Sequence, residues 1–178
     1  ESMAYKNPKG AKNWVVGING DNLDRFWGGG RNTFSLNYTH GNLSINEEVQ
    51  RQYDAMTART AGSFGKWNLN LTRLQHVSER LSLYISYSRQ WATKNLDPSE
   101  KFSLGGPYGV RAYPVGEASG DDGWRWTTEL RWNLATREGD ENIWQLIAFV
   151  DGGHVKLSHD AWQGYAGQQV RSLYGAGV

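Results

Sequence analysis

Carboxylates and imidazoles are the side chains of this sequence best suited to binding a metal ion, and their spacing decides whether they can do so. Glu117, Asp121 and Asp122 lie close together in a glycine-rich segment, and clustered carboxylates are the usual ligands of calcium. The alternate carboxylates and the terminal glutamate of an EF-hand loop are missing, so we interpret these residues as the solvated base of a loop. The 4 histidines follow no spacing typical of metal ligands. The sequence therefore predicts no metal site.

Nucleophilic catalysis is a second kind of chemistry that serine, histidine and aspartate support. The sequence contains neither a G-x-S-x-G turn, which exposes a reactive serine, nor the H-E-x-x-H helix of zinc proteases. Cysteine is absent, so neither a disulfide framework nor a thiolate metal site is available. We expect a protein that is not an enzyme and that uses no cofactor.

Arg111 is a charged residue in an unusual setting, because it lies in a long connection, residues 90–123, rich in Gly, Pro, Asp and Ser. A connection of this length in a compact domain is usually either functional or disordered. Its centre, residues 104–114, reads L-G-G-P-Y-G-V-R-A-Y-P and joins rings and aliphatic side chains to permissive glycines. This mixture favours a folded loop packed against a wall. By residue type alone, an arginine in such a loop is most often solvated.

The segments that must position this loop alternate apolar and polar residues with the period of β-strands. Seven strands are predicted in this way, and the last of them begins near Gln169. The apolar residues that share one face of their segment are Trp14, Val16, Ile18, Phe34, Leu36, Tyr38, Trp67, Leu69, Leu71, Leu81, Leu83, Ile85, Tyr87, Trp124, Trp126, Leu130, Trp132, Leu134, Trp144, Leu146, Ala148 and Val150.

The connections between these segments alternate in length. They are short near Phe26, Ser78 and Arg137, and long near Asn46, Trp91 and Leu157. Tight turns at one end and larger loops at the other are typical of outer-membrane β-barrels, with the large loops outside the cell. The charged segment 46–60 is compatible with a short helix or a solvated loop, and we favour a loop.

The alternation also assigns faces to the strand after the long loop. In a membrane barrel, charged side chains cannot point into lipid, so Arg125, Glu129 and Arg131 would face the lumen. The alternating residues Trp124, Trp126 and Trp132 would face outward. A soluble β-sandwich gives the same alternation, with its apolar face packed inward and its charges in water. The period alone does not distinguish the two.

Two short motifs resemble a known family. The run S-E-K-F-S-L-G-G-P-Y-G-V-R-A-Y-P, residues 99–114, resembles the sixth surface loop of the two-partner secretion transporters, the haemolysin secretion and activation protein family. The tip of that family loop reads Val-Arg-Gly-Tyr/Phe and matches Val110, Arg111, Ala112 and Tyr113, with alanine in place of the usual glycine. The run F-V-D-G-G at 149–153 is similar to the Phe-x-Asp-x-Gly strand motif of the same superfamily.

The resemblance implies both a fold and a set of site residues. The chain would be part of an all-β, transmembrane antiparallel barrel, about seven strands from the C-terminal part of the sixteen that the family uses. The external loop 92–122 would fold back into the lumen, where Arg111 would pair with Asp151. Val110 and Tyr113 would anchor the loop tip. Phe149, Asp151 and Gly153 form the strand motif, and Gly153 would leave room for the loop tip to approach the wall closely.

The resemblance further implies a transporter of the bacterial outer membrane that secretes and activates one large partner exoprotein: a haemolysin, an adhesin or a contact-dependent toxin. The barrel would be monomeric, surrounded by lipid and driven by no nucleotide or metal. Periplasmic POTRA domains, which bind the unfolded partner in the family, and the last barrel strands are absent from the 178 residues.

Composition supports this interpretation and leaves two alternatives open. The 22 glycines, 9 tryptophans and 9 tyrosines suit outer-membrane barrels. A formal net charge of +1 without a basic stripe argues against a nucleic-acid partner. One alternative is an outer-membrane assembly insertase of the same superfamily, although residues 95–106 resemble the secretion branch more closely. The other is a soluble, Trp-rich sugar-binding β-domain.

Overall fold

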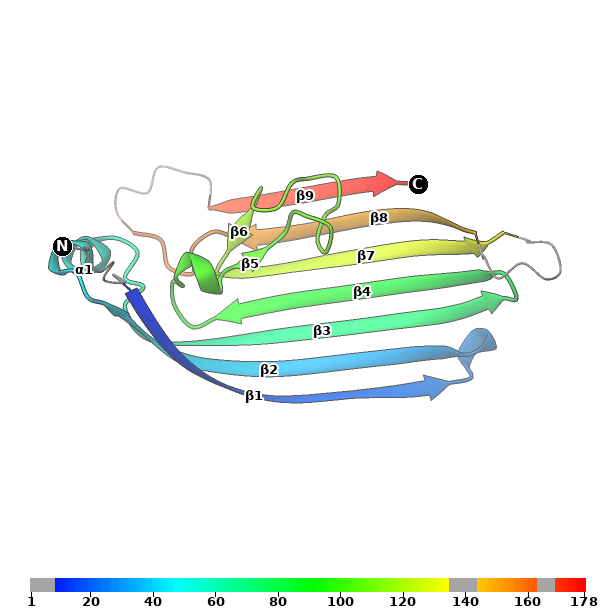
Figure 1. The fold of residues 1–178 in the computed structure, drawn as a ribbon, viewed down its shortest axis with the longest axis horizontal. Coiled ribbons are helices and arrows are strands. Elements are labelled where there is room, and N and C mark those ends of the chain that lie inside the picture. Colours follow the sequence, from blue (N-terminus) through cyan, green and yellow to red (C-terminus); the bar gives the residue numbers. More distant parts are fainter. Residues whose placement is uncertain (1–8, 135–143, 163–168) are drawn as a thin grey trace, which may run out of the picture.

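The computed structural model of the chain describes residues 9–134, 144–162 and 169–178. Within these residues, 7 strands form one antiparallel sheet in the order β1-β2-β3-β4-β7-β8-β9 (Figure 1). The strands are β1 Lys9–Asp24, β2 Gly30–Ile45, β3 Gly62–Ser78, β4 Leu81–Ala92, β7 Asp122–Asn133, β8 Gln145–Lys156 and β9 Val170–Gly177. The predicted antiparallel β architecture is confirmed. In the described ranges, no helix has the length and apolar character needed to cross a membrane.

The shorter elements all lie in connections. They are η1 Phe26–Gly28, α1 Glu48–Met56, η2 Pro98–Glu100, and the two-residue strands β5 Phe102–Ser103 and β6 Ser119–Gly120, which pair with each other. All but η1 and α1 belong to the long connection between β4 and β7. This connection therefore contains its own small hairpin, a feature that the sequence pattern did not predict.

Register places the apolar residues of neighbouring strands side by side on one face of the sheet. Leu71 of β3 lies opposite Tyr87 of β4, which in turn lies opposite Trp126 of β7. This face is not covered in the way a soluble core is, because Leu71 and Leu130 remain 41% and 44% exposed. Strand pairing thus collects the apolar side chains into a continuous surface that is open to its surroundings.

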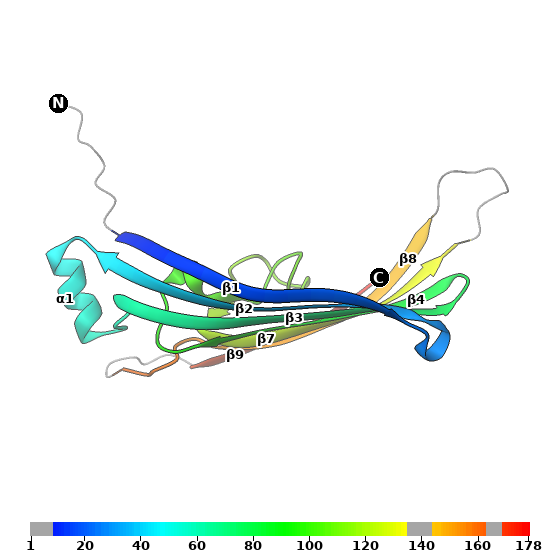
Figure 2. The same cartoon turned by 90° about the horizontal axis from the view of Figure 1, so that it is seen from below.

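The buried core lies on the opposite face, between the sheet and the long loop. Its fully buried members are Leu104 and Val110 of the loop and Val155 of β8. Figure 1 shows the loop in front of the sheet, and Figure 2 shows the same sheet edge-on with the loop on one side only. The loop therefore provides a covering layer for one face, and among the described residues no comparable layer lies over the apolar face.

The segment 46–60, for which we favoured a loop, contains the helix α1, so that prediction is wrong. Val49, Tyr53 and Met56 form a stripe at helical spacing, and Glu48 accepts hydrogen bonds from Arg51 and from Gln52 one turn along. Asp54 then ends the segment by accepting from three groups of residues 60 and 61. The predicted turn near Arg137 lies outside the described residues.

Candidate functional site

The first half of the long loop is held against β1, β3 and β4. Glu100 of η2 forms an ion pair with Lys66 of β3, with 2.8 Å between Nζ and Oε2, and accepts a hydrogen bond from the amide of Asn13 at 3.1 Å. The buried amide of Gln90 donates to the backbone oxygens of Glu100 at 3.2 Å and Asp121 at 3.0 Å. The polar side chains of three strands therefore fix where the loop begins.

Asp121 was interpreted as part of a solvated loop base, and the structure corrects this. Its side chain is fully buried and accepts from the backbone N–H of Leu96 at 3.2 Å and of His159 at 2.8 Å. It also forms an ion pair with Lys101, with 2.8 Å between Nζ and Oδ1. Asp121 thus joins the two ends of the long loop to the β8–β9 connection, whereas Glu117 is exposed as expected.

Substitution of Asp121 by alanine is expected to loosen this junction. Two backbone N–H groups and the ammonium group of Lys101 would lose their acceptor, which costs about 2 to 4 kcal/mol for a buried charged acceptor. Hydrogen exchange of residues 92–122 in the complete protein should then speed up at least about 30-fold. Asp160→Ala is the matched control, because no described hydrogen bond uses its carboxylate. Equal exchange in both variants would contradict the role assigned to Asp121.

The loop tip is anchored by apolar packing against β8 and β9. Val110 packs with Leu104, Val155 and Leu173, and Tyr113 lies against the same cluster. A Cβ atom at Gly153 would lie 2.6 Å from Leu104 Cδ2. Glycine is therefore needed on β8 for the loop to approach this closely, although the residue that approaches is Leu104 rather than the tip itself.

Arg111 projects from the tip onto the wall formed by β7 and β8. Its Nε and Nη2 atoms donate to the two carboxylate oxygens of Asp151 at 2.8 and 2.9 Å, and its backbone N–H donates to Oδ2 at 3.2 Å. Nη1 donates to Glu129 at 2.7 Å, and the guanidinium lies 3.6 Å from the centre of the Phe149 ring. The structure thus brings Arg111 and Asp151 together in a bidentate pair.

Glu129 extends this pair into a chain of alternating charges, a contact that the sequence did not predict. Its second carboxylate oxygen accepts from Arg131 Nε at 2.8 Å, and Arg131 lies over the Tyr84 ring at 4.6 Å. Two arginines therefore face two carboxylates, of which Asp151 is completely buried. A buried charge is stable only when it is paired in this way.

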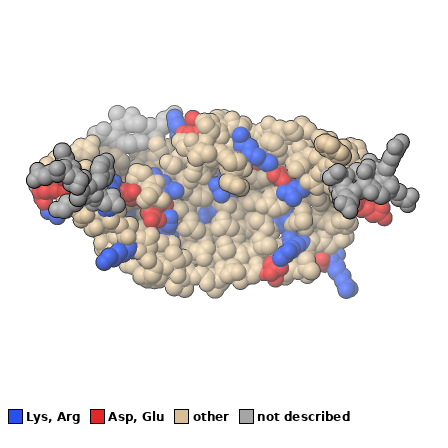
Figure 3. Space-filling model, in the orientation of Figure 1, with Lys and Arg blue, Asp and Glu red and all other residues tan. Residues whose placement is uncertain are grey.

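Arg125 lies on the same face but makes a weaker contact with the loop. Its Nη1 donates to the backbone oxygen of Ser103 at 3.3 Å, and its guanidinium lies 5.3 Å from the Phe102 ring. Figure 3, which views the molecule from the side that carries the loop, shows basic and acidic patches interspersed over this face. The three charged residues predicted to share a face do so, and that face carries the loop.

Ala112, which departs from the family motif, is accommodated by a glycine on the wall. A Cβ atom at Gly175 of β9 would lie 2.7 Å from Ala112 Cβ. Ala112 is not among the non-glycine residues with positive φ, so the methyl group introduces no backbone strain of the left-handed kind. Gly175 therefore provides the space that the extra methyl group occupies.

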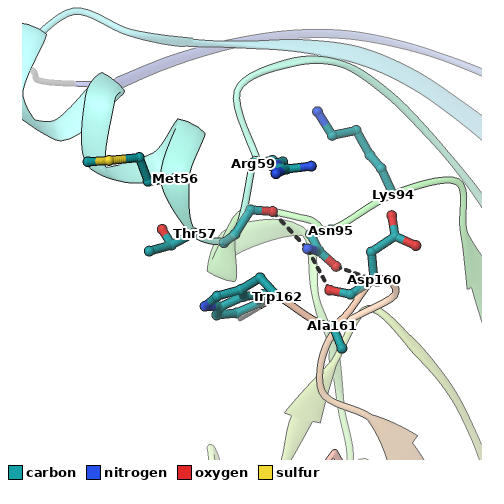
Figure 4. A pocket seen from close by; sticks show the side chains of 9 residues that line it. Met56, Thr57, Arg59, Lys94, Asn95, Asp160, Ala161 and Trp162 are labelled. Carbon is teal, nitrogen blue, oxygen red and sulfur yellow. Dashed lines mark hydrogen bonds between the residues drawn. The ribbon is translucent and has the colours of Figure 1, made fainter. Parts of the chain in front are cut away.

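A cavity of about 700 Å³ lies where three connections meet at the loop end of the sheet (Figure 4). The buried amide of Asn95 donates to the backbone oxygens of Ala58 at 2.7 Å and Asp160 at 2.9 Å, and accepts from Asp160 N at 2.7 Å. Asn95 thus ties the α1–β3, β4–β5 and β8–β9 connections together. No local sequence pattern indicates this role of Asn95, because its partners lie far away along the chain.

Asp54, in the last turn of α1, accepts hydrogen bonds from the connection that leads to β3. Burial raises the pKa of its carboxyl, but hydrogen bonds from Ala61 and Thr60 outweigh burial and hold the pKa below its usual value. The described part of the chain contains no cluster of three or more His, Asp or Glu residues that would suit a metal ion.

The chain is similar to known proteins along most of its sequence. The chain is 27% identical over 166 residues to "Outer membrane transporter CdiB" of Dickeya dadantii, covering 89% of this chain and 29% of that protein. It is 30% identical over 132 residues to "Heme/hemopexin transporter protein HuxB" of Haemophilus influenzae, covering 74% of this chain and 23% of that protein. A solved structure, "CdiB from Acinetobacter baumannii", aligns with 94% of this chain and 35% of its own at 17% identity and a TM-score of 0.41.

The chain spans less than a third of the length of these two curated relatives. The family model named "Haemolysin secretion/activation protein ShlB/FhaC/HecB" matches residues 13–177, which include every strand of the main sheet in whole or in large part, together with the long loop and its arginine. This chain therefore belongs to the haemolysin secretion/activation protein family.

Proposed function

We propose that this chain forms part of the wall of an outer-membrane β-barrel transporter that secretes one large partner exoprotein. The complete barrel would have sixteen strands, as the family resemblance implies, and would act as a monomer. The chain would supply the strands on either side of the long loop and the loop itself. No nucleotide, metal or other cofactor is part of the proposal.

One observation carries the proposal: the sheet has an exposed apolar face and a polar face that holds the core and the loop. Leu130 is 44% exposed on the first face, whereas Glu129, its neighbour in sequence, is buried against Arg111 on the second. A soluble sandwich would bury the apolar face. A membrane barrel instead turns it toward lipid and keeps polar groups inside.

The names of the relatives indicate what such a barrel transports. The relatives named CdiB and HuxB are described as an outer membrane transporter and a heme/hemopexin transporter protein. Carried to this chain, these names favour transport across the outer membrane. The description of the family as a haemolysin secretion/activation protein favours export of a partner exoprotein. The partner would cross unfolded, and its folding outside the cell would make passage unidirectional.

The loop would control the pore in this mechanism. It crosses the polar face from β1, where Lys9 pairs with Asp97 at 2.7 Å, to β8, where Arg111 pairs with Asp151. In a closed barrel this position lies within the lumen. An exported chain would either pass along the polar surface that the loop leaves free or displace the loop. The contact of Arg111 with the wall would determine whether the loop stays in place or moves.

The direct test is secretion of the exoprotein encoded beside the complete transporter gene. Both genes are expressed in a laboratory bacterium, and the exoprotein is measured in the medium and in the periplasm. We expect release into the medium only when the transporter is present, and periplasmic retention without it. Equal release with and without the transporter, while the transporter is folded in the outer membrane, would rule out the proposed function.

A further inference from the structure

The connection between β1 and β2, residues 25–29, folds back onto the sheet instead of extending beyond it. The side-chain nitrogen of Gln75 lies 3.1, 2.9 and 2.8 Å from the backbone oxygens of Phe26, Trp27 and Gly29. The N–H of His76 also donates to Gly29 O at 2.9 Å. Gln75 is only 7% exposed as a result. Figure 2 shows this blue turn curving to the side of the sheet opposite the loop.

A neutral polar cluster lies beneath the turn. Arg73 donates from Nη1 and Nη2 to the two oxygens of Asp24 at 2.6 and 3.1 Å, and from Nη1 to Asn32 Oδ1 at 2.6 Å. Its Nε donates to Gln75 Oε1 at 3.0 Å, and Nη2 donates to the same oxygen. Each N–H of the guanidinium thus has an oxygen acceptor, and its charge is balanced by Asp24. An arginine requires this arrangement where water is scarce.

The cluster interrupts the apolar face of the sheet. Arg73 follows Leu71 on the same face of β3, because residues two apart in a strand point to the same side. On β4 the residue opposite Arg73 is Ile85, and the residue opposite Gln75 is Leu83. A groove of about 370 Å³ is lined both by apolar and by polar residues, which are Phe34, Leu71, Ile85 and Tyr87 together with Asn32, Thr33, Thr72 and Arg73. Apolar surface therefore borders the cluster.

The turn itself presents two aromatic rings beside this surface. Phe26 and Trp27 are stacked, with 5.0 Å between ring centres and 14° between planes, and they are 62% and 79% exposed. Trp27 has a φ of 48°, a left-handed conformation that costs about 1 to 2 kcal/mol for a residue with a Cβ. The contacts of Gln75 offset that cost and hold the pair outward.

We propose that the β1–β2 turn is a membrane anchor, with Phe26 and Trp27 inserted where the acyl chains meet the headgroups of the periplasmic phospholipid leaflet. The assignment to this leaflet rests on the proposed function, in which short connections lie on the periplasmic side. Aromatic rings favour this boundary because one part of the ring system is apolar and tryptophan also has an N–H donor. Because Asp24 balances the charge of Arg73, this cluster places no net charge between the turn and the wall.

Fluorescence quenching at a single labelled position tests this anchor. Trp27→Cys, in a complete transporter without other cysteines, is labelled with an environment-sensitive fluorophore and placed in phospholipid vesicles. The lipids carry a nitroxide either close to the headgroup or near the chain end. We expect the label at 27 to lose most of its fluorescence with the shallow nitroxide and little with the deep one or with an aqueous nickel chelate.

Two control positions separate failure of the anchor from failure of the proposed function. Leu130→Cys should respond mainly to the deep nitroxide, and Glu79→Cys, in the other described turn at the same end, should respond to the aqueous chelate. If position 27 behaves like position 79, or responds to no quencher because protein covers it, the anchor is wrong. If neither lipid nitroxide quenches the label at position 130, the assignment of the apolar face to lipid is wrong, and the proposed function fails with it.

A second variant tests whether Gln75 holds the turn in the membrane. Gln75→Leu places an apolar side chain on the wall and removes the amide, which donates to the backbone oxygens of the turn and accepts from Arg73. With this change, the label at position 27 should become accessible to the aqueous chelate, while the label at position 130 stays unchanged. An unchanged response at 27 would contradict the role of Gln75.

Discussion

Arginine in place of Leu130 is expected to prevent most of the complete protein from folding into the outer membrane. Leu130 lies on the apolar face directly between Leu83 of β4 and Ala148 of β8, and both of these neighbours are apolar. A guanidinium at this point would face acyl chains without a partner, which costs about 2 to 4 kcal/mol near the midplane of the bilayer. Folded and unfolded barrel can be separated by their mobility on gels before and after heating.

Asn70→Arg is the matched control for this substitution. Asn70 is exposed on the opposite face of β3, where its amide contacts Ser35 Oγ at 3.3 Å. An arginine there would lie in the water of the lumen, so the yield of folded barrel should remain close to that of the unchanged protein. Equal losses for the two variants would show that the faces are assigned incorrectly.

Lysine in place of Arg111 is expected to abolish secretion while the barrel still assembles. The guanidinium joins both oxygens of Asp151 to Glu129 through three nitrogen atoms, and a single ammonium group cannot span these positions. Loss of two charge-assisted hydrogen bonds removes about 3 to 6 kcal/mol of contact to the wall. The loop would then leave its position, which added protease should detect as cleavage within residues 92–122 of transporter in intact cells.

Arg125→Lys is the control that separates position from charge. This substitution makes the same chemical change on the same face of the sheet. The one hydrogen bond described for the guanidinium of Arg125 goes to a backbone oxygen at 3.3 Å. Secretion by this variant should remain near normal. A defect as large as that of Arg111→Lys would mean that any loss of a guanidinium in the lumen impairs transport, and that the contact with Asp151 has no special role.

The alternation of apolar and polar residues was enough to predict the strands, because each strand has one apolar face that can be recognised from the residues of that strand alone. Leu81, Leu83 and Ile85 predicted β4 in this way without knowledge of its neighbours. The short motifs predicted which arginine and aspartate would meet, although the residues lie 40 apart in the chain. The strands were therefore predicted from neighbouring residues, and the Arg111–Asp151 pair was predicted from two short motifs.

Features that depend on distant partners were missed. Asp121 looks like a solvated residue among glycines, and only the fold brings Lys101 and the backbone of His159 to it. Glu129 was placed on the correct face, but its contact with Arg111 depends on how deeply the loop packs. Gln75 gave no signal at all, because its partners are backbone oxygens of a turn that folds back on it. Alternation gives the face of a residue and not its partner.

The role of the Arg111–Asp151 contact in secretion is the central claim, and a double-mutant cycle in the complete transporter measures it. Secretion of the partner exoprotein is compared among Arg111→Ala, Asp151→Ala and the double variant, each corrected for the amount of folded barrel. Arg111→Ala should be the more severe single change, because Asp151→Ala leaves Arg111 its contact with Glu129 at 2.7 Å. The double variant should be no worse than Arg111→Ala, since the same contact is already lost. If the two single defects multiply instead, the residues act independently and the loop is not held by this pair.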